Sequence, residues 1–210
     1  MKSIDIESRM QSILDAESKA VASIPFSDGY RNAVDLIVEH VHRRNGTLIT
    51  SGMGKAGQIA MNIATTFCST GTPSVFLHPS EAQHGDLGLL RPDDVLLLLS
   101  NSGKTREIVE LTVLARRLRP DIPLIVITGN PDSPLALEAD VVLSTGGSPE
   151  VCPLGLTPTT STTAMTVIGD ILVVSTMETI EFTPAQYALR HHGGYLGSKS
   201  KSMADKNFDK

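Results

Sequence analysis

The sequence predicts an α/β fold, a three-layer α/β/α sandwich built on a five-stranded parallel sheet. Continuous apolar runs, rich in β-branched residues, are typical of strands buried on both faces. Five such runs occupy residues 47–50, 74–77, 95–99, 124–128 and 141–143. Helix-like segments separate them, at residues 55–69, 105–118 and 133–139. Alternation of strands and helices favours parallel strands joined by right-handed crossovers, so we expect the flavodoxin-like strand order 2-1-3-4-5.

Helices are also predicted on either side of this repeating unit. Apolar residues recur at helical spacing over residues 6–24 and again over residues 27–44. Residues 160–181 form one long apolar helix, and Thr183 with Pro184 provides an N-cap and first turn for a short one. Two apolar helices outside the repeating unit need a covering surface, so we expect an oligomer.

Length and composition limit the class of protein. The chain has 210 residues, of which 40% are hydrophobic and 20% charged, enough for one domain with a sizeable core. Residues 1–198 are predicted to form this domain, and the polar, Lys-rich residues 199–210 a disordered tail. The formal charge of −5 gives no basic footprint, so no nucleic-acid partner is expected.

The cysteines and the apolar segments indicate a cytoplasmic protein. Two cysteines cannot form a disulfide framework. The N-terminus has no apolar signal-peptide core. The longest apolar stretch, residues 164–177, is interrupted by Asp170 and is too short to span a bilayer, so no membrane contact is expected.

In parallel sheets ligands bind beyond the carboxyl ends of the strands, so the loops after the strands are the candidate site. The first loop matches G-x-G-x-x-G from Gly52 to Gly57. A dinucleotide site would need an acidic residue about 20 positions later, and that place holds Leu77 and His78. The match is therefore weak, and the loop is interpreted as a glycine turn that presents Lys55.

The third loop has the composition of an anion-binding site. Ser100, Asn101, Ser102 and Thr105 surround Gly103, between a predicted strand and a predicted helix. The N-terminus of a helix has unpaired N–H groups and a positive dipole end. The loop is therefore predicted to bind a phosphate, although an N-cap alone would explain one of its polar residues.

Two glutamates and a late histidine are candidates for acid–base chemistry. Glu107 falls in a first helical turn, where the helix dipole alone would favour it. Glu150 lies in a loop of low charge, where we expect burial to raise its pKa toward that of a general base. His191 closes the short terminal helix and could either compensate a helix dipole or reach a neighbouring site. Cys152 is interpreted as a packing residue.

Several of these segments together resemble the sugar isomerase (SIS) family, and within it the arabinose-5-phosphate isomerases. The segments that carry the resemblance are residues 52–55, 74–79, 84–88, 100–103, 150–155, 158–163 and 191–197. The resemblance implies a homotetramer that interconverts D-ribulose 5-phosphate and D-arabinose 5-phosphate through an enediol, feeding 3-deoxy-D-manno-octulosonate synthesis for lipopolysaccharide or capsule. It implies no required cofactor, and a bound but not obligatory zinc.

The resemblance also assigns site residues. It places the family's functional lysine at Lys55, its two glutamates at Glu107 and Glu150, and its late histidine at His191. From the needs of isomerisation we hypothesise Glu150 as the base and His191 as its acid–base partner. Lys55 would then stabilise the oxyanion, and Glu107 would orient a hydroxyl. His78 is implied as a zinc contact as well as a substrate contact. The implied substrate-binding residues are Gly71, Thr72, His78, His84, Ser100, Asn101, Ser102, Thr105 and Ser161.

Some features depart from the family pattern. Longer members continue into cystathionine-β-synthase modules, and this sequence stops about where they would begin. His192 stands where proline is usual, and Lys104 and Arg106 stand where relatives are acidic or neutral, which could add positive charge beside a phosphate. An isomerase for another phosphosugar therefore remains an alternative. A non-catalytic sugar-phosphate sensor is a further alternative, and a dinucleotide-dependent oxidoreductase is a distant one.

Overall fold

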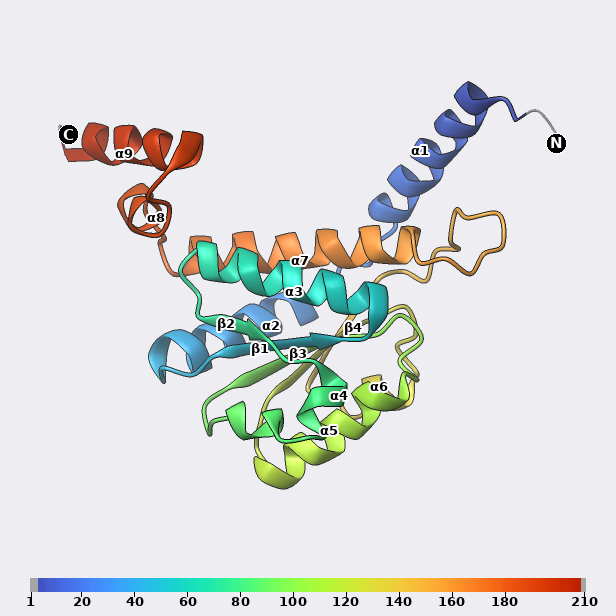
Figure 1. The fold of residues 1–210 in the computed structure, drawn as a ribbon, viewed down its shortest axis with the longest axis horizontal. Helices are drawn as coiled ribbons and strands as arrows, with labels where there is room; N and C mark the ends of the chain where they lie inside the picture. The colour runs from blue at the N-terminus through green and yellow to red at the C-terminus, as the bar shows by residue number, and fades with distance from the viewer. Residues whose placement is uncertain (1–3, 209–210) are drawn as a thin grey trace.

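The computed structural model describes residues 4–208 and confirms the five-stranded parallel sheet with the order β2-β1-β3-β4-β5 (Figure 1). The strands are β1 (Leu48–Gly52), β2 (Ser74–Phe76), β3 (Val95–Leu99), β4 (Leu124–Thr128) and β5 (Val141–Ser144). Strand β1 pairs with both β2 and β3, and Leu48 aligns with Ser74 on one side and Val95 on the other.

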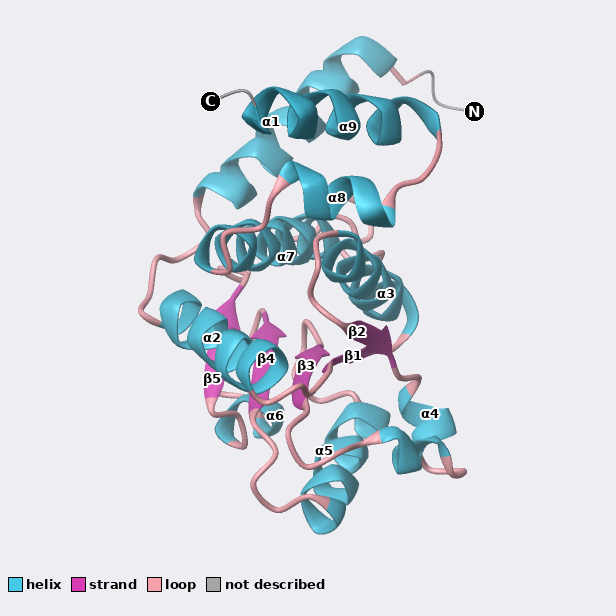
Figure 2. Ribbon diagram, turned by 90° about the vertical axis from the view of Figure 1, so that its left-hand side faces the viewer, coloured by secondary structure: helices cyan, strands magenta, loops and turns pink. Residues whose placement is uncertain are grey.

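Two layers of helices cover the two faces of the sheet (Figure 2). One layer contains α2 (Gly29–Ile37), its π-helical extension (Val38–Arg43), α3 (Gly54–Ser69) and α7 (Thr160–Thr179). The other contains α4 (Pro79–Ala82), α5 (Arg106–Leu118) and α6 (Pro134–Leu137). Residues of β3 alternate between the two cores: Leu97 and Leu99 face the first layer, and Leu96 and Leu98 face the second. This alternation explains why the strands are apolar throughout.

Helix α7 is apolar because it packs within the first layer. Its residues Met165, Ile168 and Leu172 are buried in that core, whereas Asp170 is exposed. Length and composition alone would allow this helix to cross a membrane, but half of its apolar window is buried inside the domain. That burial places the helix in the core of the domain.

Helix α1 (Ile6–Ala22) and helices α8 (Pro184–Arg190) and α9 (Gly194–Phe208) project from the layered body (Figure 1). Thr183 and Gln186 form a reciprocal capping box at the start of α8, which confirms the predicted N-cap. The segment 199–210 was expected to be disordered, but α9 continues to Phe208. Lysine, alanine and methionine in this segment favour a helix, and α9 packs against α8.

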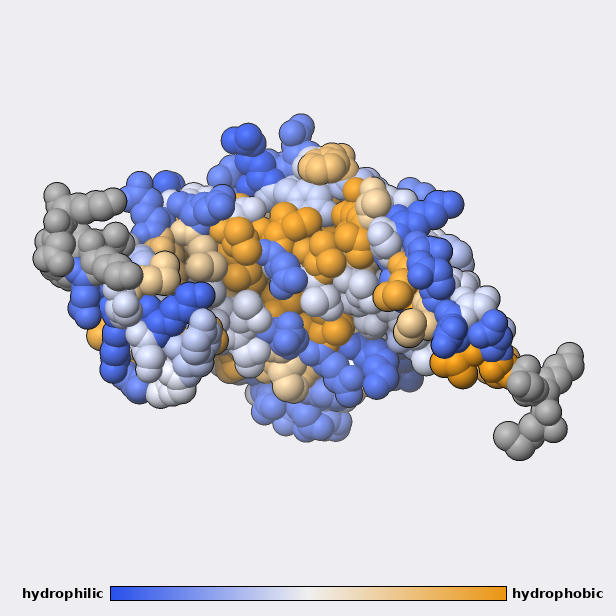
Figure 3. All heavy atoms as spheres, turned by 90° about the horizontal axis from the view of Figure 1, so that it is seen from above, coloured by the Kyte–Doolittle hydropathy of each residue, from blue (hydrophilic) through white to orange (hydrophobic). Residues whose placement is uncertain are grey.

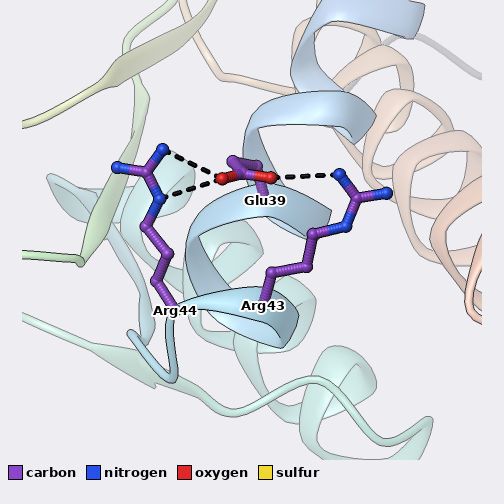
Figure 4. Close-up of polar contacts among 3 residues, drawn as sticks. All are labelled: Glu39, Arg43 and Arg44. Carbon is purple, nitrogen blue, oxygen red and sulfur yellow. Dashed lines mark hydrogen bonds and ion pairs between the residues drawn. The ribbon is translucent and has the colours of Figure 1, made fainter.

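The second helix ends as expected, with Asn45 at a positive φ of 61°. At that end Glu39 lies between two arginines and pairs with Arg43 at 3.0 Å and Arg44 at 2.9 Å (Figure 4). Hydrogen bonds from Arg44 and Arg43 hold the pKa of the Glu39 carboxyl below its ordinary value. This exposed cluster lies at the edge of the sheet where β1 begins, so it has no part in a site beyond the carboxyl ends of the strands.

The close approach of β1 and α3 gives a prediction about stability. A Cβ atom on Gly57 would lie 2.5 Å from the carbonyl oxygen of Gly52, and that backbone atom cannot move aside. Gly57→Ala is therefore expected to lower the free energy of unfolding by about 1–3 kcal/mol, as overpacking of a tight core does. Denaturant titration measures this change. Gly88→Ala, where a Cβ would meet nothing within 4 Å, is the matched control. Equal stability of the two variants would contradict the packing argument.

Candidate active site

A cavity of about 340 Å³ lies between the loops that follow β1 and β3. The chain leaves β1 for β2 on one side and returns to β3 on the other, so these two loops diverge and open a crevice at the carboxyl edge of the sheet. The loop after β5 and the first turns of α7 complete its walls. The cavity is lined by Met53, Lys55, Ala56, Leu99, Ser100, Asn101, Ser102, Thr105, Glu150, Gly155, Leu156, Pro158, Ser161, Thr162 and Met165.

The loop after β1 brings Lys55 to the cavity. Gly54 has a φ of +56°, which turns the chain sharply into α3, and Gly52 and Gly57 allow the helix to approach the strand. The glycine pattern that resembles a dinucleotide motif therefore serves packing and the turn. The Lys55 side chain is exposed, and its Nζ lies 3.4 Å from the Gln58 side-chain oxygen, so this weak contact leaves the ammonium group available to a ligand.

The loop after β3 brings all four predicted phosphate-binding residues to the cavity wall. The hydroxyls of Ser100 and Thr105 are 2.9 Å apart, and the N–H of Gly103 donates to Ser100 Oγ at 3.1 Å. Gly103 has a φ of +62°, and a Cβ there would collide with Ser133. The loop thus folds tightly over the start of α5, where no side chain caps the helix and its N–H groups and dipole favour an anion.

Lys104 and Arg106, the two basic residues after β3, do not line the cavity. Arg106 was expected to add charge beside a phosphate, but its guanidinium donates to Glu110 at 2.7 Å and is 83% exposed. The spacing of these two residues on α5 explains the pair, since side chains four apart on a helix are neighbours. Lys104 follows Gly103, is exposed, and does not line the cavity.

Glu150 caps the N-terminus of α7. Its Oε2 atom accepts hydrogen bonds from the Thr159 N–H at 2.7 Å, the Thr159 hydroxyl at 2.9 Å and the Ser161 N–H at 3.3 Å. Burial acts to raise the pKa of this carboxyl, but the hydrogen bonds from Ser161 and Thr159 outweigh it and lower the pKa. The expectation of a raised pKa was therefore wrong, because the donors come from a helix start that is not adjacent in sequence.

Cys152 lies in the same loop and is not simply a packing residue. Its Sγ accepts hydrogen bonds from the N–H groups of Thr157 at 3.1 Å and Leu156 at 3.2 Å. These donors, that of Thr157 foremost, lower the pKa of the partly exposed thiol to about 7. The contacts fold the chain back on itself between Glu150 and α7, so they help to shape the cavity wall.

Three predicted residues lie at the other end of α7. Gly71 packs under the ring of Phe182, which lies just before α8. The Thr72 hydroxyl is 3.0 Å from His42 Nε2. His191 ends α8, where its ring stacks on Tyr187 with centroids 3.8 Å apart. Glu150 caps the opposite end of α7, a helix of 20 residues. At 1.5 Å per residue the two ends are roughly 30 Å apart, so one chain cannot bring these residues into its own cavity.

Glu107, His78 and His84 are nearer to the carboxyl edge but do not line the cavity either. Glu107 is half-buried in the first turn of α5, and both histidines are exposed on the segment after β2. Across residues 4–208 there is no group of three or more His, Cys, Asp and Glu side chains that could hold a metal ion. The residues of one chain therefore do not fit the zinc site implied for His78, and we derive no step from a metal.

Comparison with protein families shows which family the chain belongs to. The sequence model of the SIS domain family matches residues 40–175. The chain belongs to the SIS domain family. Proteins of known structure agree with this assignment. A phosphosugar isomerase from Bacteroides fragilis, described as putative and involved in capsule formation, is 71% identical, with a TM-score of 0.89 over 90% of this chain and 98% of that one.

Two further relatives of this SIS domain chain are informative. The E. coli CFT073 protein c3406, solved in complex with arabinose 5-phosphate, is 35% identical, with a TM-score of 0.83 over 91% of this chain and 100% of that one. Arabinose 5-phosphate isomerase KdsD of Shigella flexneri is 45% identical over 196 residues. That alignment covers 93% of this chain but spans only 58% of the relative's length.

Sequence reasoning missed some of the cavity wall. Thr159 was not singled out, although it donates twice to Glu150. The run of hydroxyl residues before α7 was a usable signal, because such residues cluster at helix starts. Apolar wall residues such as Met53 and Met165 carried no comparable signal, since nothing in the sequence distinguishes them from core residues.

The hydrogen bonds to Glu150 predict a pH-dependent contribution to stability. A carboxyl whose pKa is lowered in the folded state stabilises the protein above its ordinary pKa, and this stabilisation is lost as the pH falls through the lowered value. The difference in unfolding free energy between wild type and Glu150→Gln should therefore shrink from pH 7 to pH 3. Denaturant titrations across this range measure it. A difference that stays constant or grows on acidification would contradict the assignment.

Proposed function

We propose that this protein is an aldose–ketose isomerase that interconverts D-ribulose 5-phosphate and D-arabinose 5-phosphate through an enediol intermediate. The observation that carries the proposal is a single cavity that combines an anion-binding loop, a carboxylate and a lysine, in Ser100–Thr105, Glu150 and Lys55. The KdsD relatives are named arabinose 5-phosphate isomerases, and the c3406 protein was solved with arabinose 5-phosphate. The named role of the Bacteroides fragilis relative supports a product used in capsule formation.

In this proposal the loop after β3 and the start of α5 bind the phosphate. The hydroxyls of Ser100, Ser102 and Thr105 and the amide of Asn101 provide directed donors, and the helix dipole adds positive potential. The phosphate then fixes the sugar chain so that its carbonyl end extends across the cavity. Lys55 and Glu150 line the cavity beyond this loop, where the reacting carbons would lie.

Glu150 then transfers the proton between the carbons. Its lowered pKa keeps the carboxyl ionised at neutral pH, as a base must be, but also makes it a weak base. Stabilisation of the enediolate must therefore be strong, and the Lys55 ammonium is the cavity's cation for the developing negative charge. His191 would move protons between the two oxygens, and Glu107 would orient a hydroxyl. We propose no required cofactor, a cytoplasmic location, and no nucleic-acid or membrane partner.

The division of residues between the two ends of α7 supports an oligomer, which we propose to be a tetramer. Gly71, Thr72 and His191 lie at one end and Glu150 at the other. Figure 3 shows an apolar area over the middle of the face between them. Helices α3 and α7 expose several large apolar residues, among them Met61, Ile171 and Val174. If two copies pack these faces antiparallel, each brings its His191 to the other's cavity.

Isotope exchange tests the role of Glu150. Wild-type protein turning over D-ribulose 5-phosphate in D₂O should place deuterium at C2 of arabinose 5-phosphate. Glu150→Gln should lower turnover by about 10²–10⁴-fold, because a positioned base contributes that much, whereas the exposed control Glu138→Gln should not. Wild-type-like exchange by Glu150→Gln would remove this residue as the base. Turnover of another pentose or hexose phosphate in place of these two would contradict the substrate.

Mixing two inactive variants tests the shared site. Glu150→Gln and His191→Asn should each be nearly inactive alone. After joint dissociation and reassembly, about a quarter of the wild-type activity should return, because a random quarter of sites would pair an intact Glu150 with an intact His191 from the other copy. Activity assay and size measurement of the mixture check this. No recovery in a mixed oligomer would show that each site takes both residues from one chain.

A further inference from the structure

Helix α1 faces the body of the protein with an unusual set of side chains. Most of its residues are exposed, and the residues shielded by the body are Arg9, Ile13, Glu17, Ala20 and Val21. Two of these carry charge, although a helix that only packs on a core presents apolar residues to it. Three large apolar residues of α1 point away from the body, since Ile6, Met10 and Leu14 are 69%, 57% and 56% exposed. The charged pair on the inner face therefore needs an explanation other than core packing.

Both charged residues contact the segment that holds Glu150. The Arg9 guanidinium donates a hydrogen bond to the carbonyl oxygen of Val151, the residue next to Glu150. The Glu17 Oε1 atom accepts from the Thr160 hydroxyl at 3.1 Å. Thr160 lies between Thr159 and Ser161, the two residues that donate to Glu150. Helix α1 thus holds the loop on one side of Glu150 and the helix start on the other.

The loop is held by individual hydrogen bonds and not by regular secondary structure. It runs from the end of β5 to the start of α7 without regular structure, and Gly146, Gly147 and Gly155 all have positive φ. Gly146 also lies close to the end of α1, where a Cβ would be 2.9 Å from the Ser23 carbonyl oxygen. The contacts of Cys152 shape one part of the loop, and Glu150 and Val151 bond it to Thr159 at the start of α7. Arg9 bonds the loop to α1, and Glu17 bonds the start of α7 to α1.

Glu17 has a further feature that packing does not explain. Its second oxygen, Oε2, is buried and has no hydrogen-bond partner within the described residues 4–208. Leaving a buried carboxylate oxygen unpaired is unfavourable, and an apolar residue would pack at this position without that cost. A carboxylate here is accounted for by its bond to Thr160.

We propose that Arg9 and Glu17 are positioning residues for Glu150: they fix the loop and the start of α7 so that the carboxylate lies correctly in the cavity. This inference rests on the proposed isomerase function for its effect on turnover, but not for its effect on the loop. Neither residue touches the cavity, so both act through Val151 and Thr160.

Hydrogen–deuterium exchange and kinetics on the 210-residue chain test the proposal together. Glu17→Ala and Arg9→Ala should speed amide exchange in residues 146–161 about tenfold or more, and lower kcat by 10- to 100-fold with KM changed less than twofold, because small misplacement of a catalytic group is costly. Glu17→Gln keeps an oxygen that accepts from Thr160 and should stay within about threefold of wild type in kcat. Glu7→Ala, an exposed glutamate on the same helix, is the matched control.

A second variant covers the case in which Glu17→Ala does not fold. Thr160→Val removes the donor from the other side of the same contact and should loosen the same amides. Where Glu17→Ala folds, the double variant Glu17→Ala/Thr160→Val should show the same amide exchange and kcat as Glu17→Ala alone, because the two residues form one contact. The proposal would be overturned if Glu17→Ala, Arg9→Ala and Thr160→Val all showed the same amide exchange and the same kcat as the control Glu7→Ala. If wild type isomerises no sugar phosphate, the function proposed above fails, and the exchange data still decide whether α1 holds the loop.

Discussion

All five strands of the sheet run in the same direction, and the rest of the structure depends on this constraint. Every loop that follows a strand leaves from one edge, and the reversal of strand order between β1 and β3 opens a crevice there. Lys55 comes from one side of the crevice and the Ser100–Thr105 loop from the other. A ligand that spans the crevice can therefore meet both the hydroxyl-rich loop and the Lys55 ammonium group.

The Glu150 carboxylate connects this crevice to the helices outside it. One oxygen caps α7, so the position of the carboxylate follows from where that helix begins. Helix α7 in turn separates the two sets of predicted site residues, and α1 contacts both the loop and the helix start. If Glu150 acts as the proposed base, its lowered pKa makes it a weak one, so the proposal depends on a nearby cation and on contacts that hold the carboxylate in place.

Much of the fold and part of the site could be predicted from the sequence, for physical reasons. Strands buried on both faces leave unmistakable apolar runs such as residues 95–99, and the hydroxyl-rich loop at Ser100 follows directly from such a run. The sign of the Glu150 pKa shift could not be predicted, because its donors come from Thr159 and Ser161 across a loop. The distance of His191 from the cavity could not be predicted either, since it depends on the direction of α7.

A crystal structure of the protein with arabinose 5-phosphate tests the central claim most directly. The account predicts phosphate oxygens within hydrogen-bond distance of the Ser100–Thr105 loop, with C2 of the sugar facing Glu150 and the His191 side chain of a neighbouring copy closing the cavity. A sugar phosphate bound with its phosphate away from this loop, or a cavity closed by no second copy, would contradict it.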